Sequence, residues 1–153
     1  MIEAGTPAPD FSLPRDGGAE LTLSSLKGGP VVLYFYPRDD TPGCTTEASD
    51  FTALLPEFQA ADATVIGVSK DTVAKHEKFI AKHDLGVILV SDAEGDLCER
   101  YGTWVEKNMY GKKSMGIQRA TVLIDAEGNV ARVWPKVKVA GHAAEVLEAV
   151  KVL

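Results

Sequence analysis

The sequence predicts an α/β fold with a central mixed sheet flanked by helices, and three observations lead to it. Apolar, β-rich runs alternate with helical patterns through the middle of the chain, which implies parallel strands joined by right-handed crossovers. The last third instead carries two strands around a short turn and then a helix, so part of the sheet is antiparallel. The length of 153 residues, without a linker, predicts one domain covering residues 1–153.

The elements of the first two thirds follow in chain order. Residues 11–13 and 21–23 flank an Asp-Gly-Gly turn and predict a small N-terminal β-hairpin. Three apolar runs bounded by turn residues predict strands buried on both faces, and they cover residues 31–36, 64–68 and 87–90. Helical patterns predict helices over residues 44–60, 71–83 and 94–101.

The first of these helices carries an apolar stripe suited to packing on the sheet. Its members recur at spacings of three and four, and they are Ala48, Phe51, Leu54, Leu55 and Phe58. Pro56 interrupts the pattern. We expect a kink or break there, because proline removes a helix hydrogen bond and clashes with the preceding turn.

The C-terminal third predicts an antiparallel hairpin followed by a closing helix. Residues 120–124 and 130–134 read as strands around a turn that contains Gly128 and Asn129. The final helix is expected over residues 142–152. Parallel strands, then a hairpin, then a last helix is the element order of thioredoxin-like folds, here with the N-terminal β-hairpin as an extension.

Composition and charge exclude several classes of function. The formal net charge is −6 and no basic cluster exceeds Lys112-Lys113, so nucleic acid is not expected as a partner. The chain does not begin with a basic segment followed by an apolar one, and no apolar run approaches the roughly 20 residues that span a bilayer. We therefore expect no membrane association and a cytoplasmic location.

The two cysteines, Cys44 and Cys98, are far apart in unrelated surroundings. This spacing fits neither a disulfide framework nor a zinc site, so no metal is expected. In a reducing compartment both should be thiols.

Residues 36–47 carry the chemistry that the sequence predicts. The segment leaves the carboxyl end of the central strand and turns directly into a helix, which places Cys44 in the first helical turn. Backbone N–H groups without an internal partner and the positive end of the helix dipole favour a thiolate there. A free cysteine with a pKa of about 8.5 can be pulled well below neutral in such surroundings.

The residues around this cysteine suit a site that binds a substrate next to a thiolate. Pro37 stiffens the loop, and Gly43 permits close approach of the backbone to a substrate. The Thr41 hydroxyl can donate to the thiolate or accept from a substrate O–H group. Arg119 opens a predicted strand that can bring its guanidinium to the same end of the sheet. The alternative is an ordinary proline- and glycine-containing loop followed by a buried cysteine.

The spacing Pro37-x-x-x-Thr41-x-x-Cys44 resembles the active-site motif of peroxiredoxins. Residues 35–45 together are similar to the subfamily called PrxQ or bacterioferritin comigratory protein. The resemblance extends over nearly the whole chain, with further matching segments at residues 105–107, 109–113, 136–139 and 141–142.

The resemblance implies a role for each residue of the motif. Cys44 is expected as the peroxidatic nucleophile, Thr41 and Arg119 as polar partners of the peroxide, and Pro37 as the shield of the pocket. The backbone amides of Gly43 and Cys44 would complete the substrate site.

The implied reaction is a thiol-dependent peroxidase reaction. Hydrogen peroxide or an organic hydroperoxide is reduced to water or an alcohol, and Cys44 becomes a sulfenic acid. Thioredoxin or a similar thiol would recycle it, without a cofactor, in a monomeric protein. A disulfide oxidoreductase of the same fold is excluded, since Glu47 stands where Cys-x-x-Cys needs its second cysteine. A non-enzymatic redox sensor or thiol-dependent chaperone is the alternative from another class.

The sequence departs from the family at the resolving cysteine. Many members carry one five residues after the nucleophile, where this chain has Ser49, and others carry one on the next helix, at the position of Ile80. Cys98 is what remains, either as a resolving or regulatory thiol or as a side chain packed with Leu97 and Tyr101. A bond between Cys98 and Cys44 would require local unwinding of the helix that begins near Cys44.

Three further expectations concern other residues. His76 and His83 lie roughly 10 Å apart along one helix, too far for one zinc, and with their lysine neighbours they predict a solvated face. Glu47 either tunes the site or hydrogen-bonds the loop. An irregular stretch is expected to be partly buried against the sheet or the pocket rim at Trp104, Met109, Tyr110 and Met115.

Overall fold

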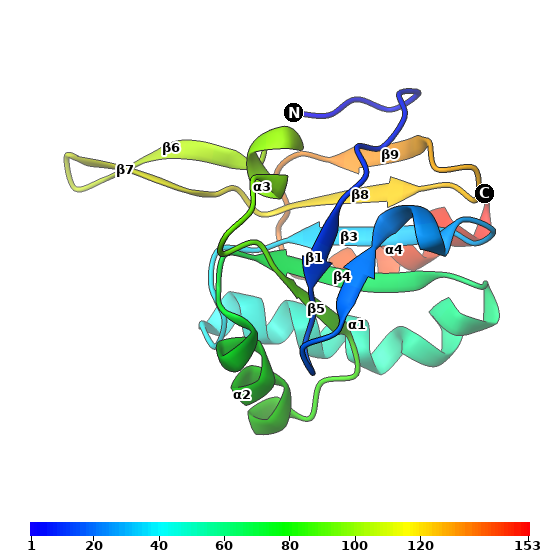
Figure 1. Ribbon diagram of the computed structural model, residues 1–153, viewed down its shortest axis with the longest axis horizontal. Coiled ribbons are helices and arrows are strands. Elements are labelled where there is room, and N and C mark those ends of the chain that lie inside the picture. The colour runs from blue at the N-terminus through cyan, green and yellow to red at the C-terminus, as the bar shows by residue number, and fades with distance from the viewer.

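A computed structural model describes residues 1–153 and contains a central five-stranded sheet in the order β5-β4-β3-β8-β9 (Figure 1). The first three strands in chain order run parallel, and the last two are antiparallel to their neighbours. The predicted mixed sheet is therefore confirmed. Its strands are β3 (Val31–Phe35), β4 (Thr64–Ser69), β5 (Ile88–Ser91), β8 (Ala120–Ile124) and β9 (Val130–Trp134).

Strand β3 lies at the centre of the sheet, and all five of its residues are buried. Because successive side chains in a strand point to opposite faces, Val32 and Tyr34 enter one apolar core, while Val31, Leu33 and Phe35 enter another. The sheet thus separates two cores, and each is covered by a different set of elements.

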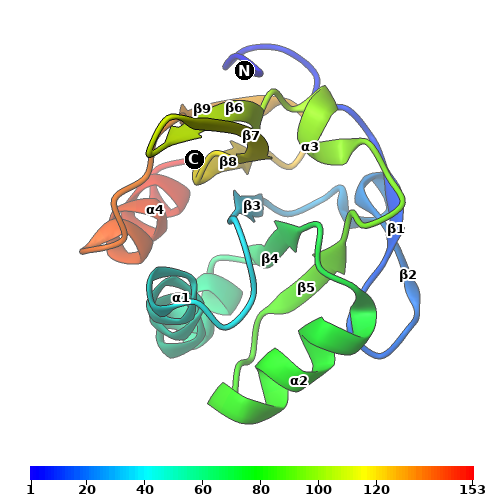
Figure 2. The same cartoon turned by 90° about the vertical axis from the view of Figure 1, so that its left-hand side faces the viewer.

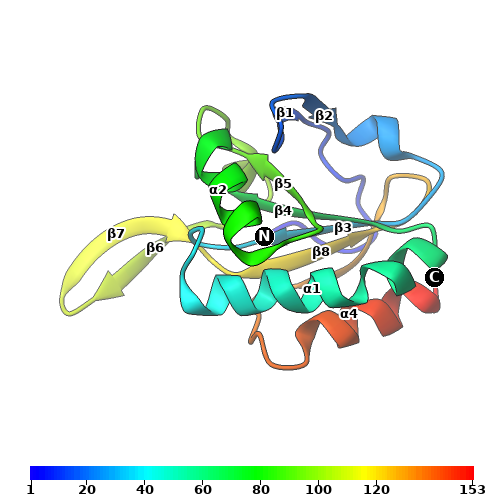
Figure 3. The same ribbon diagram turned by 90° about the horizontal axis from the view of Figure 1, so that it is seen from below.

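Helices α1 (Pro42–Ala60) and α4 (His142–Lys151) lie side by side over the first core (Figure 3). Helix α2 (Val73–His83) adds Phe79 to the same core. Figure 2 shows these three helices on one side of the sheet. None of the helices is long and apolar enough to cross a membrane.

The second core is covered by shorter elements. The N-terminal hairpin was predicted and is present, with β1 and β2 paired antiparallel. These covering elements are β1 (Ser12–Pro14), β2 (Glu20–Thr22), the 3₁₀ turn η1 (Leu23–Leu26) and α3 (Leu97–Arg100).

Two helices differ from their predicted form. Helix α1 begins at Pro42, two residues earlier than expected, and continues through Pro56, so the expectation of a break at this proline is wrong. Helix α3 is a single turn rather than eight residues. The Asp92 carboxylate accepts from the backbone N–H groups of Leu97 and Cys98, which holds the preceding residues in a loop outside the helix.

The stretch predicted to be irregular forms an antiparallel hairpin of β6 (Trp104–Met109) and β7 (Lys112–Ile117). It projects away from the sheet (Figure 1), and the expected burial is wrong for Met109, Tyr110 and Met115, which are exposed. Trp104 alone is half-buried. Tyr110 and Gly111 make the turn with φ angles of 54° and 80°. Positive φ at both turn residues matches a hairpin turn, but tyrosine is an unusual residue for it, which is why the sequence signal was missed.

Candidate active site

The topology brings the start of α1 and the start of β8 to the same edge of the sheet. Phe35, the last residue of β3, pairs with Ala120, the first residue of β8. Residues 36–41 connect β3 to α1, and Cys44 is the third residue of that helix. The first backbone bond of the helix runs from the Thr45 N–H to the Thr41 carbonyl, so the amides of Gly43 and Cys44 have no intrahelical partner. These two N–H groups are available to a bound anion or polar substrate.

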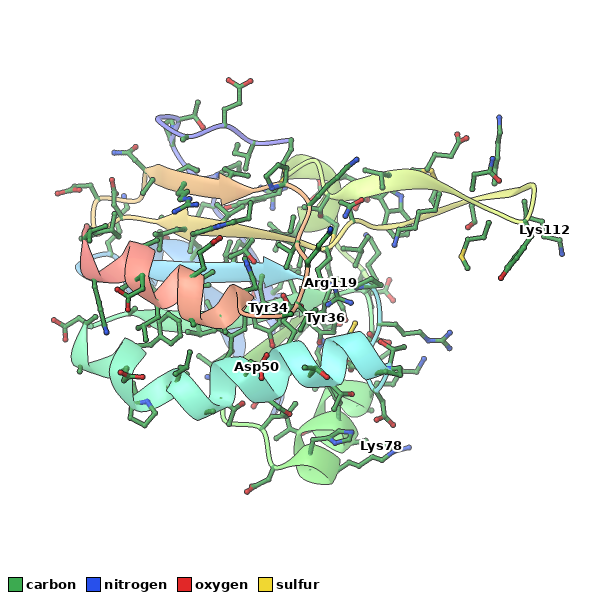
Figure 4. All side chains as sticks on the ribbon, turned by 180° about the vertical axis from the view of Figure 1, so that it is seen from behind. Tyr34, Tyr36, Asp50, Lys78, Lys112 and Arg119 are labelled. Atoms are coloured by element: carbon green, nitrogen blue, oxygen red, sulfur yellow. The ribbon has the colours of Figure 1, made fainter.

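Arg119 directly precedes β8 and reaches the Cys44 sulfur. Its Nη2 donates to Cys44 Sγ at 3.2 Å, and its Nη1 donates to Glu47 Oε1 at 2.6 Å. Figure 4 shows Arg119 and Tyr36 at the same end of the sheet, close to the first turns of α1. A Cβ atom at Gly43 would lie 3.2 Å from Arg119 Nη2, so glycine leaves the room that the guanidinium occupies.

The charge of Arg119 is secured by its surroundings. Burial alone would lower the pKa of the guanidinium, but the neighbouring Glu47 and Cys44 outweigh it and raise the pKa above the usual value. Arg119 is therefore a permanent cation in contact with a buried sulfur. A cation at this distance stabilises negative charge on the sulfur.

Glu47 is almost completely buried, with 1% of its surface exposed. Burial raises the pKa of its carboxyl to about 7, Arg119 opposes this rise, and Asp50 adds to it. The Oε2 atom of Glu47 has no hydrogen-bond partner. Two roles were expected for Glu47, tuning the site or hydrogen-bonding the loop. Its hydrogen bond is with Arg119 and not with the loop. Near pH 7 it neutralises only part of the arginine charge.

Thr41 and Pro37 take different places around the sulfur. Thr41 is the N-cap residue of α1, and its hydroxyl donates to the Arg38 carbonyl at 3.0 Å rather than to Cys44. Since its single proton is used there, its oxygen can still accept a hydrogen bond from a substrate. Pro37 is exposed at the beginning of the loop, directly after the buried Tyr36.

The loop before Cys44 is anchored to α2 by a buried histidine. His76 Nδ1 lies 2.7 Å from Asp39 Oδ2, and His76 Nε2 lies 3.0 Å from the Val90 carbonyl. The Tyr36 hydroxyl donates to the other oxygen of Asp39. The prediction that His76 lies on a solvated face is wrong, because Asp39 supplies the partner that lets a polar ring be buried. Both ring nitrogens face oxygen atoms, so the ring is held in place from both sides.

A second anchor holds the next loop residue. Asp40 has a φ angle of 61° and accepts from Lys82 Nζ and His83 Nε2, each at 2.7 Å. Lys82 and then His83 lower the pKa of the Asp40 carboxyl. The expected solvated face of α2 is found at Lys75, Lys78 and Lys82, which are exposed. Helix α2 thus fixes the loop at Asp39 and at Asp40.

Cys98 lies in the core on the other face of the sheet from Cys44. It is fully buried beside Leu97 and Tyr101, which matches the packed side chain that the sequence left as one alternative. Burial and the nearby Asp92 raise the pKa of its thiol far above the usual value. Both cysteines are free thiols, with the sheet between them.

Lys107 is a residue near the site that the sequence reasoning missed. It lies on β6, and its aliphatic stem packs over Gly116, where a Cβ atom would be 3.1 Å from Lys107 Cδ. Burial and then the charge of Arg119 lower the pKa of the Lys107 amine, whereas Cys44 opposes this. A glycine inside a strand often marks a close approach, so Gly116 was the available signal.

Comparisons with known proteins match this architecture. Residues 4–133 match the model of the AhpC/TSA family. The chain is 52% identical over 146 residues to a putative peroxiredoxin Bcp of Coxiella burnetii, covering 95% of this chain and 97% of that protein. It is 49% identical over 150 residues to peroxiredoxin Bcp of Bacillus subtilis, covering 98% and 96%.

Two solved structures superpose closely on this chain. The bacterioferritin comigratory protein of Xanthomonas campestris, studied for its alkyl peroxide reduction activity, superposes with a TM-score of 0.92 at 48% identity, covering 98% of both chains. A PrxQ cysteine-to-serine variant from Xylella fastidiosa gives a TM-score of 0.94 at 40% identity, covering 99% of this chain and 97% of that one.

Proposed function

Because the chain belongs to the Bcp/PrxQ peroxiredoxins of the AhpC/TSA family and is therefore a peroxidase, we propose that Cys44 is its peroxidatic nucleophile. The observation that carries the proposal is the 3.2 Å contact between Arg119 Nη2 and the Cys44 sulfur at the first turn of α1. The unpartnered amides of the same helical turn add to the arginine as partners for negative charge.

The reaction follows from this geometry. The Cys44 thiolate attacks one oxygen of the peroxide, an S–O bond forms, and the O–O bond breaks. The leaving oxygen takes a proton and departs as water or an alcohol, and Cys44 is left as a sulfenic acid. Arg119 and the amides of Gly43 and Cys44 stabilise the charge on the leaving oxygen. The Thr41 hydroxyl oxygen accepts a hydrogen bond from the O–H group of the peroxide. Pro37, at the start of the loop, shields the pocket from solvent.

We extend the substrate range to organic hydroperoxides on the similarity to the Xanthomonas protein studied for alkyl peroxide reduction. Hydrogen peroxide shares the same O–O bond and is the smaller substrate. The subfamily supports a monomer working in the cytoplasm.

The sulfenic acid is recycled by a thiol from outside the chain, such as thioredoxin. The positions at which relatives carry a resolving cysteine hold Ser49 and Ile80. Cys98 packs in the opposite core, and a disulfide requires Cα atoms within about 7 Å. Cys98 is therefore a structural side chain in this proposal.

Steady-state peroxide consumption with thioredoxin and its reductase tests the nucleophile. Cys44→Ser is expected to abolish turnover, because a serine hydroxyl is not ionised near neutral pH and cannot attack the O–O bond. Cys98→Ser is the matched control. Its rate of peroxide consumption should stay within about twofold of the parental rate, because the substitution replaces a buried thiol on the other face of the sheet. A Cys44→Ser protein that consumes peroxide at the parental rate would exclude the proposal. Repeated turnover by the parent also separates an enzyme from a sensor, which reacts once.

Intact-mass analysis after one equivalent of peroxide tests the recycling route. We expect a gain of one oxygen, or a mixed disulfide when a small thiol is present. A loss of two hydrogens without dimerisation would instead assign Cys98 as the resolving cysteine.

A further inference from the structure

A basic groove lies beside the loop that leads to Cys44. It is a pocket of about 360 Å³ between that loop and helix α2. Figure 4 shows Lys78 extending from α2 on the side of the molecule where α1 begins. The lining residues are Arg38, Asp39, Asp40, Asp71, Lys75, Lys78, Phe79 and Lys82.

The three carboxylates of the groove are already engaged within the protein. Asp39 is held by a histidine of α2 and by a tyrosine hydroxyl. Asp40 is held by a lysine and a histidine at the end of α2. Asp71 accepts from the Asp39 backbone N–H and from a serine hydroxyl. Asp40 is thus paired with Lys82, and internal hydrogen bonds engage Asp39 and Asp71, so the basic side chains of the groove outnumber its carboxylates by one.

Three cations of the groove remain without an ion pair. Arg38, Lys75 and Lys78 form no salt bridge, and their side chains are at the surface. Lys75 and Lys78 are three apart on α2 and so share one face of the helix. Opposite them, Arg38 projects from the loop. An anion entering the groove meets positive charge from both walls.

The groove is within reach of the reacting sulfur. Four bonds of the Cα trace separate Asp40 from Cys44, which limits the distance between their Cα atoms to about 14 Å even in a fully extended chain. The intervening residues turn into α1, which shortens this distance. A ligand of about three residues in length, spanning roughly 10 Å, can hold its charged groups in the groove and extend a thiol toward Cys44.

On the basis of the proposed function, in which an outside thiol reduces Cys44, we propose that this groove binds the carboxylates of a small anionic thiol that acts as reductant. Its volume lies within the range of small-molecule sites, about 300–1,000 Å³. The Cys44 sulfenic acid and one thiol give a mixed disulfide and water. A second thiol then attacks the mixed disulfide, releases the Cys44 thiol and leaves as the oxidised small-molecule disulfide.

Charge reversal of the groove tests the proposal with three small thiols of different charge. The double variant Lys75→Glu/Lys78→Glu removes two exposed cations that are outside the catalytic machinery. The rate of recycling by the end-blocked tripeptide thiol Asp-Asp-Cys, which carries two side-chain carboxylates and has the required length, is expected to fall about tenfold at low salt. Recycling by neutral 2-mercaptoethanol should stay within about twofold, and recycling by cationic cysteamine should increase.

A matched control keeps the same change in net charge at the other end of the sheet. Lys27→Glu/Lys151→Glu alters two exposed lysines near the C-terminus of α1 and should recycle with all three thiols as the parent does. If both double variants change the recycling rates equally, net charge alone explains the effect and the proposed binding site is overturned.

The oxidation of Cys44 by one equivalent of peroxide is measured separately in each protein. If the parent is not oxidised, the proposed function fails. If it is oxidised and the charge-reversed variant still recycles with the acidic tripeptide thiol at the parental rate, only the groove assignment fails. A variant that loses recycling by thioredoxin but not by the acidic tripeptide thiol would assign the surface to a protein reductant and likewise overturn the proposal.

Discussion

Glu47 places an ionisable carboxyl against the cation that contacts the Cys44 sulfur. A charged carboxylate there competes with the sulfur for the Arg119 charge, and a neutral carboxyl leaves that charge to the site. Because burial raises the pKa of Glu47 to about 7, the balance changes within the range of pH at which enzymes work. The carboxyl also orients the guanidinium through a 2.6 Å hydrogen bond.

Glu47 predicts a specific pH dependence of stability. The folded protein holds the Glu47 proton up to a pKa of about 7, whereas the unfolded chain releases it near 4.5. The corresponding stabilisation is complete below pH 4.5 and is lost as the pH rises through 7, which amounts to about 3 kcal/mol. Urea unfolding across this range should therefore give a flatter profile for Glu47→Gln than for the parent. Parallel profiles of the two proteins would contradict the assignment.

The parts of the site that local patterns determine could be predicted from the sequence. A buried strand followed by a loop and a helix places Cys44 in a first helical turn, and the structure has it there. The burial of His76 could not be predicted, because its partner Asp39 is 37 residues away and only the tertiary fold brings them together. The side of the sheet occupied by Cys98 depends in the same way on how α3 packs.

At the scale of single elements, the β6–β7 hairpin stands out because few contacts with the rest of the protein stabilise it. It forms a separate two-stranded sheet that extends beyond the five central strands (Figure 1). Isolated two-stranded hairpins are marginally stable in water. Its turn residue Tyr110 is fully exposed and has a left-handed backbone conformation, which costs free energy without any compensating contact.

A matched pair of substitutions at the turn tests this interpretation. Tyr110→Asn creates an Asn-Gly turn that suits positive φ and should slow amide hydrogen exchange in the hairpin several-fold, corresponding to about 0.5–1 kcal/mol. Tyr110→Val places a β-branched residue at the same position and should accelerate exchange. The melting temperature of the whole protein should change by less than about 2 °C in both, since the core is untouched. Equal exchange rates in the two variants would contradict the strain at Tyr110.

The hairpin also shows where sequence patterns stop being informative. Its strands alternate weakly, because only their inner ends contact the rest of the protein, and most of their side chains are exposed. The five central strands were predictable for the opposite reason: burial on both faces requires continuous apolar runs. The predicted length of helix α3 was too great. The Asp92 carboxylate accepts hydrogen bonds from the backbone N–H groups of Leu97 and Cys98, which replaces the helical bonds of an earlier turn.

At the scale of the whole molecule, one sheet organises two independent apolar compartments. The compartment under α1 and α4 contains Cys44, and the one under α3 and the N-terminal hairpin contains Cys98. Helix α2 adds two anchors to the loop between β3 and α1. The scaffold thereby fixes the loop and the helix start that the proposed chemistry needs.

Under the proposed function, the sheet between the two thiols determines how long an oxidised Cys44 persists. An intramolecular disulfide would protect a sulfenic acid, but here the sheet lies between Cys44 and Cys98. Under the proposed function, the persistence of the sulfenic acid is set by the supply of thiol in solution. When peroxide is abundant and thiol is scarce, a second peroxide molecule reaches Cys44 first and converts it to the sulfinic acid, an irreversible inactivation for most proteins.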